Sequence, residues 1–370
     1  MKPSKFALWI ALACLVTVNY SCSGCYNPSD PVATSYNKII YTLGGSASSP
    51  GVYSMNTDGS GKTLIYPNGQ VSSSPRGNFL LIAKLLPNDS TEYIMTDLAG
   101  KNEKKLFVIN GINIYAILSP DAKYVAYNYY IFGSRYYLRL HKLDDNTDIA
   151  IGDTLTVNGH NVPVFSPDSK RLLYTSDDFT IRFMNVDGTG NSALVTNAYN
   201  MHSQAYSPQS FDWSLDASQI CYDALGTGHI ESLSFYDMLT GLTTSHKVDS
   251  LTALSVRISP KGTYTLYQTG GLLSYHGNQY FVSTPWLYNI STGEAKQLIL
   301  PYPAAAHGIV DYTWSPDEKK LLLQSSGSNP DGSGFYSTIF SVDVASGNAI
   351  DLQMPNVGFC EIFWSLSLSQ

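Results

Sequence analysis

The chain has 370 residues, of which 14% are charged and 44% are apolar, and its net charge is −7. An average soluble domain is roughly 25% charged, and the apolar fraction found here excludes an intrinsically disordered chain. The acidic balance argues against a surface that binds phosphates, so nucleic acid is excluded as a partner. The abundance of Gly (29), Pro (18) and Tyr (27) predicts many short strands joined by turns.

The first 21 residues have the pattern of a signal peptide. Lys2 and Lys5 form a positively charged start, and the segment 6–18 is an apolar run of 13 residues. A membrane-spanning helix needs about 20 apolar residues, so this run has the length of a signal-peptide core instead. We therefore expect residues 1–21 to be a signal peptide and the protein to be exported.

A cysteine follows the apolar run and offers a lipid-attachment site. Ser21 directly precedes Cys22, which resembles the lipobox of bacterial lipoproteins, although Asn19 stands where a lipobox usually carries Leu. The resemblance implies that Cys22 is lipidated, that residues 22–36 form a flexible tether, and that the outer membrane holds the anchor. The protein would then face the periplasm or the cell surface and touch the membrane through its lipid only. Cys25 is a second candidate, and an ordinary secreted protein is the other alternative.

The rest of the chain is built from a repeat of about fifty residues. Its first landmark is a turn beginning with Ser, usually Ser-Pro-Asp, followed by a short apolar strand. The turns begin at Ser74, Ser119, Ser166, Ser214, Ser259, Ser315 and, truncated, Ser365. A second landmark, a turn that runs from Asn or Asp to Gly, follows in most units and is typical of a hairpin. In the unit around Ser166 we expect strands at 161–165, 171–175, 180–185 and 193–196.

Four short antiparallel strands in each unit are typical of a propeller blade. The first strand of the fold, at 38–43, matches a second blade strand, and the last, at 358–365, matches a first. Pairing these two would close the ring and leave no open sheet edge. The sequence therefore predicts an all-β, single seven-bladed β-propeller over residues 37–370, with the C-terminal strand closing the N-terminal blade.

The repeat motif resembles a known family. Ser-Pro-Asp, a Lys and an apolar strand, with a following Asn-x-Asp-Gly turn, resembles the WD40-like (PD40) repeat of TolB-type propellers, from about residue 35 to the end. TolB itself differs, because it has six blades and an additional amino-terminal α/β domain. The resemblance implies a non-catalytic scaffold of the cell envelope that binds a protein or glycan ligand on one face of the ring.

The carboxylates of the repeat do not form a catalytic set. Asp121, Asp168 and Asp317 recur once per blade in the Ser-Pro-Asp turns, which indicates a structural role. The Asx-to-Gly turns lack the calcium-loop pattern, and only the segment 144–148 is considered for a weak surface cation. No nucleophile elbow, P-loop or dinucleotide motif is present in the sequence. We assign no catalytic residue, no metal and no cofactor.

Histidines carry the alternative function. His160, His202 and His307 each precede the first strand of a blade, where connecting loops gather on one face. Imidazoles from several blades could bind Mn²⁺ or Zn²⁺ there. Seven-bladed oligogalacturonate lyases, which have related repeats, place a metal on such a face. The alternative is therefore a metal-dependent polysaccharide lyase-like enzyme, whereas in a scaffold these three residues mark a ligand face or act as structural hydrogen-bonding groups.

Two further residue types have predicted roles. Cys221 and Cys360 lie in apolar strand patterns of non-adjacent units, so we expect two buried free thiols and no disulfide. Tyrosines are concentrated at 127–137, 275–280 and 301–303. They are typical both of binding surfaces and of ordinary sheet packing.

Overall fold

The structure, a computed structural model, consists of β-strands joined by turns. No helix of membrane-crossing length and hydropathy occurs among the residues that it describes. These residues are 38–43, 49–73, 79–87, 90–110, 113–130, 136–151, 163–176, 180–195, 211–225, 230–248, 256–275, 278–301, 307–328, 335–352, 354 and 362–364. The predicted signal peptide and tether, Cys22 and Cys25 included, lie outside them.

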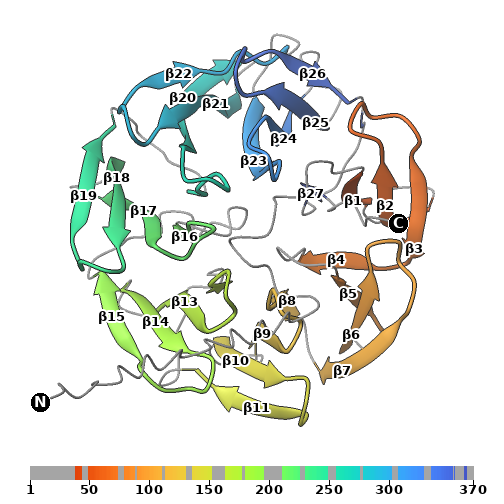
Figure 1. Cartoon of the computed structure of the whole chain (residues 1–370). Coiled ribbons are helices and arrows are strands. Elements are labelled where there is room, and N and C mark those ends of the chain that lie inside the picture. Colours follow the sequence, from red (N-terminus) through yellow and green to blue (C-terminus); the bar gives the residue numbers. More distant parts are fainter. Residues whose placement is uncertain are drawn as a thin grey trace, which may run out of the picture.

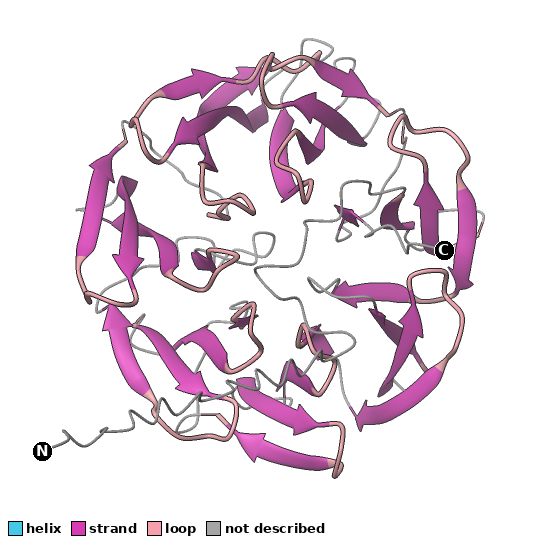
Figure 2. Ribbon diagram, viewed as in Figure 1, coloured by secondary structure: helices cyan, strands magenta, loops and turns pink. Residues whose placement is uncertain are grey.

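Seven antiparallel sheets surround a central axis as the blades of a ring (Figure 1), and Figure 2 shows the same ring by secondary structure. Blade 1 contains β27 (Ile362–Trp364), β1 (Ile39–Leu43), β2 (Gly51–Met55) and β3 (Thr63–Pro67). Blade 2 contains β4 (Gln70–Ser73), β5 (Phe79–Leu85), β6 (Ser90–Asp97) and β7 (Lys104–Asn110). Blade 3 contains β8 (Asn113–Leu118), β9 (Tyr124–Tyr130), β10 (Tyr136–Lys142) and β11 (Thr147–Ala150).

The remaining blades follow in chain order. Blade 4 contains β12 (Val164–Phe165), β13 (Arg171–Thr175), β14 (Ile181–Asn185) and β15 (Ser192–Val195). Blade 5 contains β16 (Phe211–Trp213), β17 (Gln219–Leu225), β18 (Ile230–Asp237) and β19 (Thr243–Lys247). Blade 6 contains β20 (Tyr264–Tyr275), β21 (Asn278–Asn289) and β22 (Ala295–Gln297), with a single bridge between Ile258 and Thr265 on the inner side. Blade 7 contains β23 (His307–Trp314), β24 (Lys320–Ser328), β25 (Phe335–Asp343) and β26 (Ala349–Asp351).

The two ends of the chain close the ring as predicted. Strand β27 pairs antiparallel with β1, so that Trp364 lies opposite Ile39 and Ile362 lies opposite Tyr41. The last strand is thereby the innermost strand of the first blade, beside β1 (Figure 1). The seven-bladed, all-β fold is confirmed, and the four strands expected around Ser166 are found as β12 to β15.

The core lies between the blades, and the second strand of each blade is covered on both faces. Strand β24 shows this, because Leu321, Leu322 and Leu323 are all fully buried. Leu321 and Leu323 pack in a cluster with blade 6, whereas Leu322 packs with Ile39 and Met55 of blade 1. Alternate residues of a strand point to opposite faces, so a strand between two blades reads as a continuous apolar run. The outermost strands, such as β19 and β22, are mostly exposed.

The topology gives the ring two different faces. In the blades that follow the closed one, the Ser-Pro turn links the first strand to the second, and the Asx-to-Gly turn links the third to the fourth. Because neighbouring strands are antiparallel, both kinds of turn lie on one face, which we call the turn face. The links from second to third strand, and from each blade to the next, belong to the other face, the hairpin face.

Candidate functional site

The turns around the axis on the turn face are held by their own side chains. In four blades the Ser hydroxyl donates to the Asp carboxylate two residues later, at 2.6–2.8 Å. The pairs are Ser119–Asp121, Ser166–Asp168, Ser214–Asp216 and Ser315–Asp317. The same hydroxyl accepts the backbone N–H of the first residue of the second strand, as Lys320 N–H to Ser315 Oγ at 2.8 Å. The predicted structural role of these aspartates is confirmed.

Electrostatics follow from this geometry. Burial raises the pKa of Asp216. Hydrogen bonds from the Ser214 hydroxyl and from the amide and hydroxyl of Ser218 outweigh this effect, so the net shift of the pKa is downward. A carboxylate with a lowered pKa stays ionised at neutral pH and is a poor proton acceptor. The Asp216 carboxylate is therefore suited to holding the backbone and not to general acid–base chemistry.

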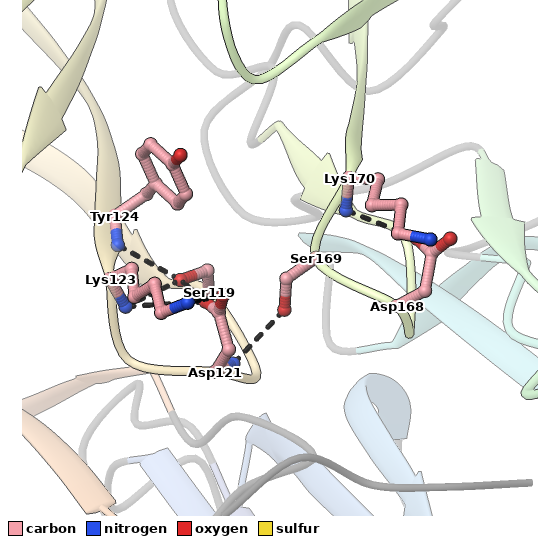
Figure 3. Close-up of polar contacts among 7 residues, drawn as sticks. All are labelled: Ser119, Asp121, Lys123, Tyr124, Asp168, Ser169 and Lys170. Atoms are coloured by element: carbon pink, nitrogen blue, oxygen red, sulfur yellow. Dashed lines mark hydrogen bonds and ion pairs between the residues drawn. The ribbon is translucent and has the colours of Figure 1, made fainter. Parts of the chain in front are cut away.

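The fourth residue of the turn has a positive φ in blades 3 to 7, and in blades 4 and 7 its side chain reaches the neighbouring blade. Ser169, with φ 59°, follows Asp168 in the blade 4 turn, and its Oγ accepts the backbone N–H of Asp121 in blade 3 at 3.0 Å (Figure 3). Ser169 is buried, although it lies in a turn. This contact joins two blades through residues that are 48 positions apart in the sequence.

Blade 6 departs from the motif, and the next blade compensates. Its turn reads Ser-Pro-Lys-Gly, so that Lys261 stands where the turns of blades 3, 4, 5 and 7 carry Asp. Glu318, at the position in blade 7 that Ser169 holds in blade 4, supplies the missing carboxylate. Its oxygens accept hydrogen bonds from Ser259 Oγ (2.5 Å), the backbone N–H of Lys261 (2.5 Å) and Thr263 Oγ1 (3.0 Å). Glu318 is only 8% exposed, so blade 7 completes the turn of blade 6 from within the packed interface.

A second charged link joins the inner sides of the same two blades. Arg257, just before the Ile258 bridge, forms an ion pair with Asp311 of β23, with 2.8 Å between Nη2 and Oδ1. Its Nη1 donates to the carbonyl of Tyr312, and its backbone N–H donates to the Tyr312 hydroxyl at 2.6 Å. The guanidinium carbon lies 5.4 Å from the centre of the Tyr312 ring. These charges neutralise each other within the protein.

A buried thiol lies close to this region. Cys221 of β17 is free, as predicted, and is fully buried. Burial raises the pKa of its thiol well above the usual value, and the negative charges of Asp212 and Asp223 raise it further. The thiol is therefore protonated at neutral pH and behaves as a small apolar side chain. Cys360 lies outside the described residues.

In the segment 144–148, considered for a surface cation, two carboxylates bind groups of their own blade. Asp148 accepts from the Tyr127 hydroxyl at 3.1 Å and lies 3.3 Å from Nδ1 of His141. Asp145 binds the amide and hydroxyl of Thr147, and the hydrogen bond from that hydroxyl is the main cause of its lowered pKa. Within the described ranges, no three His, Cys, Asp or Glu side chains are grouped to hold a metal ion.

The predicted histidine and tyrosine residues have different outcomes. His307 is the first residue of β23 and lies at the end of that strand on the hairpin face, but its side chain is not among those described. His160 and His202 lie outside the described residues, so the convergence of the three histidines stays a prediction. Of the first tyrosine-rich segment, Tyr127 packs in the core cluster between blades 2 and 3, which is the sheet-packing alternative.

Sequence reasoning missed the residues that link blades 6 and 7. Arg257, Asp311 and Glu318 each carry a weak signal. Arg257 and Asp311 are charged residues within otherwise apolar inner segments, and Glu318 directly follows Asp317 in a blade whose preceding blade has a turn without Asp. Each signal alone shows that the residue is unusual, but not which residue it contacts.

The comparisons with known proteins support the fold. No protein-family model and no curated protein sequence matches the chain. Among solved structures, the periplasmic gluconolactonase of Pseudomonas aeruginosa matches with a TM-score of 0.56 and 11% identity, over 90% of this chain and 99% of that one. An oligogalacturonate lyase in complex with manganese matches with a TM-score of 0.56 and 13% identity, over 80% of this chain and 84% of that one.

TolB is among the matching structures, as the repeat resemblance predicts. TolB from Acinetobacter baumannii is 14% identical, with a TM-score of 0.49, and the match covers 89% of this chain and 66% of TolB. The gluconolactonase and oligogalacturonate lyase likenesses, each with a TM-score of 0.56, establish a shared β-propeller fold and, at 11–13% identity, no more than that. Since propellers serve many functions, the function has to be argued from the residues of this chain.

Proposed function

We propose that the protein is a non-catalytic lipoprotein of the cell envelope whose TolB-like propeller binds a protein or glycan ligand on the hairpin face. One observation carries this proposal. In the described part of the chain, two charged side chains on the inner side of blades 6 and 7 are bonded within the protein, since Arg257 pairs with Asp311 and Glu318 binds the turn of blade 6. Charged groups that are bonded within the protein stabilise the ring. A rigid ring can then present its connecting segments as a binding surface.

We choose the hairpin face as the binding face because the polar groups of the turn face already bind one another. On the turn face, the Ser, Asp and backbone groups of the turns satisfy each other at close range. The hairpin face carries the longest strands of the structure and the end of β23 at which His307 lies. Segments that extend beyond a packed scaffold are free to vary with the ligand, and recognition concentrates on them.

The amino-terminal segment supports attachment to the envelope. Residues 1–21 as a signal peptide and Cys22 as the lipidated residue would tether the propeller to the outer membrane by its lipid alone, with the ring in the periplasm or at the cell surface. We expect Cys22→Ala to abolish the incorporation of a labelled fatty acid, while the matched Cys25→Ala variant keeps it. Labelling that persists in Cys22→Ala and disappears in Cys25→Ala would move the anchor to Cys25.

The non-catalytic part of the proposal is tested on polysaccharides. The purified full chain is incubated with polygalacturonate and with uncharged polysaccharides, with Mn²⁺ or with EDTA, and both binding and the release of unsaturated oligosaccharides are measured. We expect binding without cleavage in both conditions. Cleavage that EDTA abolishes, and that is lost in a variant with His160, His202 and His307 all replaced by Ala, would establish the metal-dependent lyase instead.

A further inference from the structure

The turn between β18 and β19 in blade 5 exposes two leucines. Leu239 is 94% exposed, the highest value among the large apolar side chains that the structure describes, and Leu242 is 69% exposed. Both belong to the Asx-to-Gly turn that begins at Asp237, so they lie on the turn face. Between Asp237 and Lys247 the sequence has no Asp, Glu, Lys or Arg. The end of this turn is therefore uncharged and carries two exposed apolar side chains.

The fold of the turn does not explain these leucines. In blades 5, 6 and 7 the N–H of the turn Gly donates to the carbonyl of the Asx, and the N–H of the Asx donates to the carbonyl of the residue after the Gly. On this shared backbone, the positions of the two leucines are held by Ser291 and Glu294 in blade 6 and by Ala345 and Asn348 in blade 7. The turn therefore forms equally with small or polar residues at both positions.

The backbone of the blade 5 turn can leave water at little cost. Every N–H from residue 237 to residue 242 donates a hydrogen bond within the protein, at 2.7–3.3 Å. Two of these N–H groups, of Leu239 and Thr240, donate to Oδ1 of Asp237, which also accepts from the Thr240 hydroxyl. Unpaired backbone donors are what makes a loop costly to transfer from water, and the donors of this turn are already paired.

The predicted lipid anchor joins the fold on the same face. Strand β1 is the second strand of blade 1, so it begins on the turn face. Lys38 directly precedes it, and its Nζ donates to Oδ1 of Asn56 in the Asx-to-Gly turn of blade 1 at 2.7 Å. Cys22 lies 16 residues before Lys38, and a segment of this length spans at most roughly 55–60 Å. A lipid on Cys22 would therefore keep the turn face close to the bilayer.

Blade 5 lies across the ring from the point at which the chain enters it. Figure 1 shows β1 on one side of the axis and β18 and β19 on the opposite side. Once a lipid holds the chain at the membrane, a second contact is intramolecular and needs only a weak affinity of its own. Apolar side chains gain free energy when they leave water for the bilayer interface, so two leucines are enough for such a contact.

We propose that Leu239 and Leu242 insert into the bilayer that holds the Cys22 anchor and orient the propeller with its turn face toward the membrane. The inference rests on the proposed function, because it needs the lipid on Cys22, and it adds a second, weaker contact to that attachment. It directs the hairpin face, on which we propose that the ligand binds, away from the membrane.

A fluorescent label at position 242 tests this contact. The full chain is produced as a lipoprotein with Leu242→Cys and Cys25→Ser, labelled with the environment-sensitive dye NBD and reconstituted in phosphatidylcholine vesicles. Cys221 is fully buried, and a chain with Cys25→Ser alone corrects for labelling of the native cysteines. We expect brominated acyl chains to quench the label about twofold or more, because interfacial apolar groups lie about 5–10 Å deep in the bilayer.

Two further chains provide matched controls. Leu85→Cys places the same label where the side chain is 68% exposed, at the hairpin-face end of β5, and this label should not be quenched. Leu239→Ser, combined with the label at position 242, removes one leucine and keeps a residue type that the blade 6 turn accepts at Ser291. It should lower the quenching to that of the label at position 85. The melting temperature should be unchanged in each chain, because the altered side chains are exposed.

Three results would overturn the inference. They are no quenching at position 242, equal quenching at positions 242 and 85, and quenching at position 242 that Leu239→Ser leaves unchanged. A label at position 242 that stays in water on vesicles, and changes its emission only when an envelope extract is added, would assign the leucines to a protein partner.

Failure of the proposed function gives a different result. The fluorescence measurements use chains in which fatty acid incorporation has been verified, so they concern the leucines alone. A chain that incorporates no fatty acid at Cys22 would refute the proposed attachment, and the membrane contact of the leucines with it.

Discussion

Replacing Glu318 by Ala should destabilise the interface between blades 6 and 7, because this carboxylate accepts three hydrogen bonds from the blade 6 turn. The Ser259 hydroxyl is fully buried and loses its acceptor, and a stranded buried donor costs about 1–3 kcal/mol. The Lys261 amide and the Thr263 hydroxyl lie nearer the surface and return to water, at about 0.5–1.5 kcal/mol each. The expected loss in the free energy of unfolding is therefore about 2–6 kcal/mol.

A second substitution tests the reason for this loss. Lys261→Asp gives blade 6 a Ser-Pro-Asp turn. In blades 3, 4, 5 and 7 the Ser hydroxyl binds the Asp of its own turn, although the turn of blade 5 has Leu in place of Pro. In the Glu318→Ala background it should restore part of the lost stability. In the unaltered chain it should destabilise, because the new carboxylate would lie beside that of Glu318. The same substitution thus has opposite signs in the two backgrounds.

The four proteins are compared by urea denaturation followed by tryptophan fluorescence, and the coupling free energy comes from the double-mutant cycle. We expect a favourable coupling of about 2 kcal/mol or more between Lys261→Asp and Glu318→Ala. If the two substitutions are additive, or if Glu318→Ala alone costs less than about 0.5 kcal/mol, then Glu318 does not complete the turn of blade 6.

Three other predictions concern pH, the inner ion pair and ring closure. Hydrogen bonds from the Thr189 hydroxyl and amide lower the pKa of Asp187. The stability that this carboxylate contributes is therefore present above the unfolded pKa of about 3.9 and is lost as the pH falls through the folded pKa. Asp187→Asn should lower the free energy of unfolding at pH 7, and in denaturant titrations near pH 2 the variant and the unaltered chain should be equally stable. Arg257→Ala removes the ion pair with the largely buried Asp311 and should cost about 3–5 kcal/mol, against less than about 1 kcal/mol for Lys105→Ala, which removes an exposed ammonium from its pair with Glu92, both measured in urea. Truncation after residue 355 removes β27 from β1 and should abolish cooperative melting, whereas removal of residues 1–36 takes away no described strand and should leave the melting temperature unchanged; a cooperative melt of the truncated chain near the usual temperature would contradict the closed ring.

The sequence alone was sufficient for the blade count and for the closure of the ring, because both depend on local patterns. A Ser-Pro-Asp turn needs only its own serine and aspartate, 2.6–2.8 Å apart where the motif is complete, so it repeats visibly along the chain. A second strand such as β24 is covered by blades on both faces, so it is a continuous apolar run wherever it occurs. A missing first strand at one end and an extra one at the other then leave a single way to close the ring.

The contacts between blades were decided by the tertiary structure. Glu318 and Ser259 are 59 residues apart, and Arg257 and Asp311 are 54 apart, so no local pattern connects them. The left-handed fourth residue of the turn occurs in several blades, but its side chain reaches the preceding blade only where it is long enough or close enough to find a donor. These features arise from how neighbouring blades pack, and packing brings together residues that the repeat itself keeps about fifty positions apart.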